Sequence, residues 1–201
     1  HSALGWFEKA MTDSRFEENA AWYIMECRFM LKDYAYVASN AEKMYQSVPA
    51  ERKPHLARII SESYLVLGDK DNARKYYDLN TVDSAAKTRA DWFYSGSLLY
   101  AIEDFKGAID NYNMVTMRID SIGQIANYHL GFSYIQTKNK VAAMQAFKDA
   151  SFLDFSKEIK EDAYFNYAKL AFDLNDDPSV FQQYLAAFPE AKKGDRINSY
   201  I

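Results

Sequence analysis

The chain repeats itself about every 35 residues, and this period restricts its fold more than any other feature. The segment WFYSGSLLYAIEDFKGAIDNY, from Trp92, aligns without a gap with NYHLGFSYIQTKNKVAAMQAF, from Asn127. Steps of about the same length reach related segments that start at Ala57, at Trp22 and at Tyr164. Repeats of this length are typical of solenoids, in which each unit buries its apolar surface against its neighbours.

Each repeat has the pattern of two amphipathic helices. Apolar residues recur at spacings of three and four, and a short polar turn such as Glu103-Asp104 divides the unit. We expect small residues where the two helices of a pair approach each other, and large residues where space between neighbours must be filled. The small residues are Ser61, Gly96, Gly131 and Ala168 in first helices, and Ala73, Ala108 and Ala143 in second helices. The large residues are Tyr64, Leu99 and Tyr134, followed by Tyr77, Tyr112 and Phe147.

Composition agrees with an all-α fold and argues against several functions. Seven Gly and four Pro among 201 residues are too few for the many tight turns of a β-sandwich or barrel. A net charge of −4 without a basic stripe argues against nucleic-acid binding. No segment has the apolar length of a membrane span, and the single Cys27 excludes an internal disulfide or a cysteine-based metal site.

Capping signals mark several helix starts in the sequence. Ser14-x-x-Glu17 and Ser121-x-x-Gln124 have the spacing of capping boxes before first helices. Asp177-Pro178 predicts an N-cap and a first-turn proline before the last second helix.

These features resemble the tetratricopeptide repeat, with the best match at residues 128–134 followed by Ala143, Phe147 and Ala150. The resemblance implies a right-handed α-solenoid of antiparallel helix pairs. It places a second helix of a preceding repeat at 2–13, repeats at about 19–49, 54–86, 89–121, 124–156 and 161–190, and the start of a further helix at 192–201. We therefore expect one array that is a portion of a longer one, with uncapped ends able to self-associate.

The resemblance also predicts a partner-binding surface. In tetratricopeptide proteins the first helices line a concave groove, which their second, fifth, ninth, twelfth and thirteenth residues face. Carried onto this sequence, those positions give a face rich in aromatic rings with a few charges, suited to a peptide or a partner helix. Ile135 is the twelfth residue of its repeat, and Asp173 is one of the charges on this face. The predicted groove residues are Tyr23, Arg58, Glu62, Phe93, Tyr100, Tyr128, Phe132, Phe165, Lys169 and Phe172. For any single ring, the alternative is packing against a neighbouring helix.

The groove lacks the carboxylate clamp of chaperone-binding tetratricopeptide domains. Tyr23 and Cys27 stand where that clamp has Lys and Asn, and Ile59 stands at its next Asn position. Binding of the C-terminal tails of chaperones is therefore not expected.

No enzymatic activity, metal or cofactor is expected from this sequence. It contains no metalloprotease, nucleophile-elbow or phosphate-loop motif. His129 lies on a predicted first helix next to the groove, and a lone histidine there is expected to be a structural hydrogen-bonding group.

The last two repeats and the ending QQYLAAFPEAKKGDRINSYI resemble repeat proteins of bacterial cell envelopes. That resemblance implies a periplasmic or outer-membrane-associated location, with the cytoplasm as the alternative. Three functions stay open: a scaffold for protein partners, a carbohydrate-binding or uptake accessory module, and an architectural spacer that self-associates.

Overall fold

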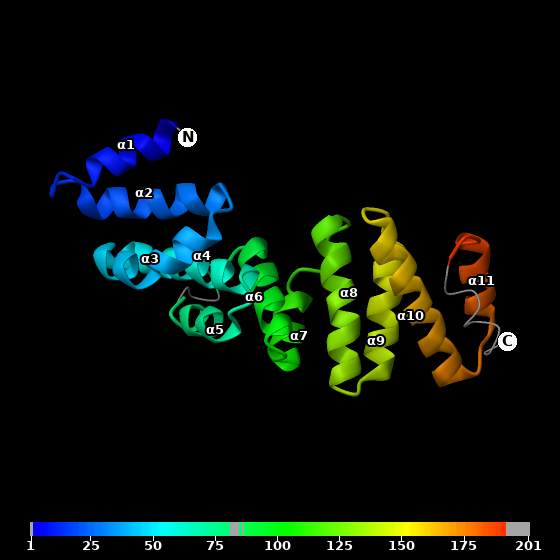
Figure 1. Ribbon diagram of the computed structural model, residues 1–201. Helices are drawn as coiled ribbons and strands as arrows, with labels where there is room; N and C mark the ends of the chain where they lie inside the picture. The colour runs from blue at the N-terminus through cyan, green and yellow to red at the C-terminus, as the bar shows by residue number, and fades with distance from the viewer. Residues whose placement is uncertain (1, 81–84, 86, 192–201) are drawn as a thin grey trace. The chain divides into compact units, whose positions relative to one another are not determined.

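The computed structural model describes residues 2–80, 85 and 87–191, and in these residues the chain is all-α, with no strand (Figure 1). Within residues 2–80, and again within residues 87–191, each helix packs against the next one in the chain, which is a solenoid-like arrangement of antiparallel helix pairs. The helices are α1 (Ser2–Ala10), α2 (Glu17–Met30), α3 (Tyr34–Ser47), α4 (Lys53–Val66), α5 (Lys70–Asp78), α6 (Arg89–Ala101), α7 (Phe105–Asn113), α8 (Ser121–Gln136), α9 (Lys140–Ser151), α10 (Lys157–Asn175) and α11 (Ser179–Ala187). A short 3₁₀ helix, Ala50–Arg52, precedes α4.

The chain divides into two compact units, His1–Lys87 (unit 1) and Thr88–Ile201 (unit 2), each with its own core. In unit 1, α2, α3, α4 and α5 bury apolar residues such as Met25, Val37, Leu56 and Tyr76. In unit 2, α8, α9 and α10 bury Phe147 and Leu170, and α10 and α11 enclose Phe181. The predicted start of a helix at 192–201 and part of the repeat at 54–86 lie outside the described residues.

The predicted small positions are the points of closest approach between paired helices. Ser61, Ala73, Ala108, Ala143 and Ala168 are fully buried. A Cβ atom added to Gly96 would lie 2.8 Å from the ring of Tyr112, and one added to Gly131 would lie 2.5 Å from the ring of Phe147. The absence of a side chain at both glycines therefore makes room for a large ring on the second helix.

One of the three large positions on the second helices differs from the prediction. Tyr112 and Phe147 are buried as expected, but Tyr77 at the matching place in α5 is only half-buried, and its neighbour Tyr76 is buried instead. The Tyr76 ring stacks on Tyr64 and its hydroxyl donates to Glu42 of α3, at 3.1 Å. These contacts favour Tyr76, because a buried tyrosine needs a hydrogen-bond partner for its hydroxyl.

The turn inside each described helix pair has the same backbone form. One residue of each turn adopts the left-handed conformation. In four of the five turns the next residue is an Asp or Asn that caps the second helix. The left-handed residues are Lys32, Gly68, Glu103, Lys138 and Asp176. The caps are Asp33, Asp69, Asp104 and Asn139, each accepting a hydrogen bond from a backbone N–H three residues on.

The capping predictions were wrong in detail. Helix α2 begins at Glu17 after Phe16, which provides no side-chain cap, and Ser14 lies outside the helix. Helix α8 is capped by Asp120, and Ser121 is its first residue. Before α11 the N-cap position is Pro178, while Asp177 accepts from the backbone N–H of Ser179. In each case the cap falls one or two residues from the predicted position, or is absent.

The left-handed turn positions make a prediction about stability. Only Gly68 adopts this conformation without steric cost, so Gly68→Ala should lower the free energy of unfolding by about 1 kcal/mol, and Lys138→Gly should raise it by a few tenths to about 1 kcal/mol. Chemical denaturation of both variants would measure this pair of opposite shifts. Shifts of the same sign would contradict the role assigned to the turn.

Candidate functional site

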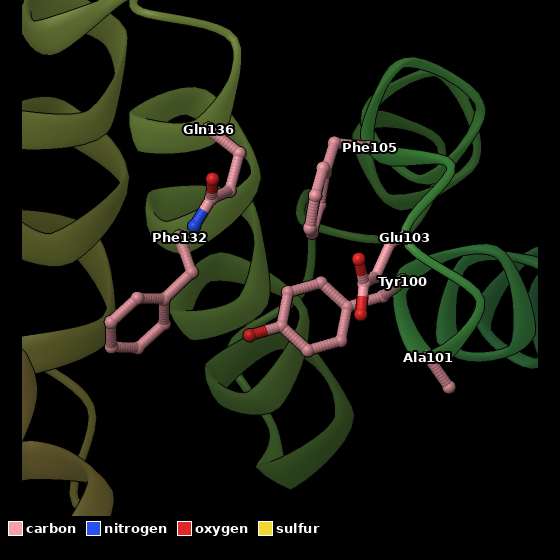
Figure 2. A pocket seen from close by; sticks show the side chains of 6 residues that line it. All are labelled: Tyr100, Ala101, Glu103, Phe105, Phe132 and Gln136. Carbon is pink, nitrogen blue, oxygen red and sulfur yellow. The ribbon is translucent and has the colours of Figure 1, made fainter.

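The candidate site is a groove on unit 2, formed by two adjoining pockets along the first helices α6, α8 and α10. The first, here the aromatic pocket, has a volume of about 420 Å³ (Figure 2). It is lined by Tyr100, Ala101, Glu103, Phe105, Phe132 and Gln136. Its lining thus combines three aromatic side chains with one carboxylate and one amide.

The second pocket, here the lysine pocket, has a volume of about 310 Å³. It is lined by Phe132, Ile135, Lys140, Phe147, Asn166, Lys169, Leu170 and Asp173. Lys140 lies 3.7 Å from Asp173, so one of the two lysines has a carboxylate beside it. Phe132 lines both pockets, so the two pockets adjoin at α8.

The local sequence explains how the rings reach the groove. Tyr100 lies in the last turn of α6, and Phe105 opens α7 directly after the Asp104 cap. The tight turn between them brings the two rings to 5.9 Å, edge to face. Phe132 is held on α8 by edge contacts with Tyr128 and Phe147, both 5.0 Å between ring centroids.

His129 fixes the orientation of Tyr100. Their rings stack in parallel, 4.6 Å apart. The Tyr112 hydroxyl donates to Ser97 Oγ, at 3.1 Å, and lies 2.8 Å from His129 Nδ1. Because the hydroxyl proton is used on Ser97, His129 Nδ1 is the donor to Tyr112, and His129 is a structural hydrogen-bonding group, as expected.

Burial lowers the pKa of His129 to about 4, and this makes unit 2 sensitive to acid. In the unfolded chain His129 takes up a proton near pH 6.5, but in the folded chain it does so only near pH 4. The free energy of unfolding is therefore undiminished above pH 6.5 and should fall by about 2 kcal/mol between pH 7.5 and pH 5. Urea denaturation at both pH values would measure this loss, which His129→Gln should remove. An unchanged pH dependence in His129→Gln would contradict the assignment.

The remaining predicted residues of unit 2 line neither pocket. Phe93 lies against Tyr112, and Phe165 and Phe172 pack against Phe181. Tyr128 donates its hydroxyl to Asp162, at 2.8 Å, and burial together with this carboxylate raises its pKa. These four rings pack against neighbouring helices, which is the alternative that the sequence left open for any single ring.

The predicted residues of unit 1 lie apart from any large pocket. The ring of Tyr23 stacks on Phe7 at 4.7 Å, and the two line a small apolar pocket of about 180 Å³ between α1 and α2. Arg58 and Glu62, one turn apart on α4, approach to 3.5 Å. Burial raises the pKa of the Glu62 carboxyl.

Sequence reasoning placed five residues of these pockets on the groove face, but not all of their neighbours. They are Tyr100, Phe132, Ile135, Lys169 and Asp173. Glu103, Phe105 and Lys140 belong to the turn and to the start of the second helix, which the family pattern of first-helix positions does not cover. Gln136 occupies the thirteenth position of its repeat, so a fuller use of the same pattern would have found it.

Two further classes of site were sought in the described part of the chain. Residues 2–80, 85 and 87–191 contain no group of three or more His, Cys, Asp or Glu side chains that could hold a metal ion. None of their helices combines the length and the apolar character needed to cross a membrane. Comparison of the chain with models of known protein families and with curated proteins finds no match.

Proposed function

We propose that the chain is a protein-interaction scaffold of the tetratricopeptide type, and that the groove of unit 2 holds an extended peptide or a partner helix. The observation that supports this most is that the two pockets adjoin at Phe132. Together they offer partly exposed rings for anchoring and charged side chains at the rim, which is the composition of peptide-binding surfaces. The proposal includes no catalytic step.

Peptides selected from a displayed random library against the intact chain would test this function. Ile135 is 37% exposed and lines the lysine pocket, so Ile135→Asp should leave the fold intact and weaken the selected peptides at least about tenfold. Val141, 64% exposed on α9 and outside both pockets, supplies the matched control Val141→Asp, which should leave affinity unchanged. A selection without binders, or equal loss in both variants, would count against the groove.

We also propose a location at the periplasmic side of a bacterial cell envelope. The support is the resemblance of the last two repeats to envelope repeat proteins. Fractionation of the source cells, with protease treatment of spheroplasts, would test it. Protection of the protein together with cytoplasmic markers would place it in the cytoplasm instead.

A further inference from the structure

The aromatic pocket has the chemical make-up of a receptor for a positively charged group. Tyr100, Phe105 and Phe132 come from three successive helices, and Glu103 from the turn between the first two. Figure 2 shows the Phe105 and Tyr100 rings near each other with the Glu103 carboxylate beside them, whereas the Phe132 ring lies apart on α8 and points away from both. Aromatic faces carry negative electrostatic potential, so rings arranged around a space attract an ammonium or guanidinium group, and a nearby carboxylate adds to that attraction.

Neighbouring groups do not oppose a cation in this pocket. His129, which stacks on Tyr100, is neutral near pH 7 because burial lowers its pKa to about 4. Among the described residues that line the pocket, Glu103 is the one acidic side chain, and none is a lysine or an arginine. The stack also holds Tyr100 in place before a ligand arrives, which reduces the entropy lost on binding.

The lysine pocket, one repeat further along, has the opposite charge. In the alignment of repeats, Ile135 corresponds to Tyr100, Lys140 to Phe105 and Lys169 to Phe132. The lysine pocket therefore has two ammonium groups and one carboxylate where the aromatic pocket has rings and a carboxylate. A cationic side chain would be attracted to the first pocket and repelled from the second, so the chemistry belongs to one repeat and is not a property of the groove in general.

We propose that the aromatic pocket binds the cationic side chain of a lysine or an arginine in the partner peptide. This inference rests on the proposed function, since it names what one part of the groove recognises. Arginine and lysine present the same positive charge on an apolar stem, and the stem would lie along the rings of Tyr100 and Phe105.

Small probes added to the intact chain would test the pocket without knowledge of the partner. The probes are Nα-acetyl-lysine methylamide, Nα-acetyl-arginine methylamide, and the uncharged Nα-acetyl-norleucine methylamide, with binding followed by the ring-current shifts of the probes' side-chain protons. Both cationic probes should bind at least about fivefold more tightly than norleucine, and added salt should weaken them. Glu103→Gln should weaken the cationic probes about fivefold and leave norleucine unaffected. Asp110→Asn, an exposed carboxylate change on α7 that lines neither pocket, should change nothing.

Each outcome supports or overturns a distinct part of the proposal. Norleucine bound as tightly as lysine would make the pocket a purely apolar one and overturn the inference. Failure of all three probes, while library-selected peptides still bind and still respond to Ile135→Asp, would overturn the cation site alone. Failure of both probes and peptides would remove the proposed function as well. Loss of lysine and arginine binding in Tyr100→Leu, with norleucine retained, would support the ring as the cation's partner.

Discussion

Gln124→Met is expected to lower the free energy of unfolding of unit 2 by about 3 kcal/mol, although it changes the side-chain volume little. Gln124 on α8 is fully buried. Its amide nitrogen donates to the carbonyl of Leu153 at 2.6 Å and lies 3.3 Å from those of Ala150 and Ser156, and its Oε1 accepts from the N–H of Ser156 at 2.7 Å. One side chain thus hydrogen-bonds to the backbone of Leu153 and Ser156 in the connection between α9 and α10, and to that of Ala150 near the end of α9.

The size of the loss follows from the groups left behind. A thioether can replace none of these hydrogen bonds. The Ala150 and Ser156 carbonyls keep backbone partners, whereas the Leu153 carbonyl and the Ser156 N–H lose theirs. Each buried backbone group without a partner costs about 1–3 kcal/mol. Denaturant titration of the variant would measure the change. Gln182→Met, on the exposed face of α11, is the matched control and should be neutral within about 0.5 kcal/mol. A loss below about 1 kcal/mol in Gln124→Met would mean that water or a backbone shift replaces the amide.

Gly131→Ala is the second large effect, and its sign opposes helix propensity. In the interior of an exposed helix, alanine in place of glycine stabilises by about 1 kcal/mol. At Gly131 the new Cβ atom would lie 2.5 Å from the Phe147 ring, which is only 1% exposed and has no room to retreat. We expect a net loss of about 3 kcal/mol from this overpacking.

Two further variants separate the clash from the propensity. Gly5 lies in α1, and a Cβ atom added there would meet nothing within 4 Å beyond its own stretch of helix, so Gly5→Ala should stabilise by about 0.5–1 kcal/mol. Phe147→Leu should make Gly131→Ala less harmful in the double variant than in the parent chain, and a double-mutant cycle would measure this coupling. Simple additivity of the two changes would contradict the contact as the cause.

The repeat pattern alone predicted the all-α fold, because a 35-residue period with helical spacing has few other solutions. It also predicted the close contacts at Gly96 and Gly131, since a small residue that recurs opposite a large one marks an interhelical approach. The caps could not be assigned in the same way. Ser121 and Asp120 are both good N-caps, and only the backbone conformation of the preceding loop decides between them.

The groove was predictable only in part, for a related reason. First-helix positions follow from periodicity, and this is why Tyr100 and Phe132 were found. Whether a ring at such a position faces open space depends on its neighbours: Phe172 meets Phe181 on α11, whereas Tyr100 meets His129 and leaves a pocket beside it. Those neighbours come from other helices, so the outcome depends on packing that periodicity does not specify.

Because the helices pack against their chain neighbours, the array is suited to growth by duplication. Consider a copy of the pair α8–α9 inserted after Ser151. Its first helix would pack on α9, which already packs against the first helix α10, and its second helix would offer α10 the same surface that α9 offers now. Gain or loss of a whole pair therefore leaves the remaining contacts intact, whereas an insertion inside a helix would shift its apolar face out of register. Variation in length among chains built in this way should come in steps of about 35 residues.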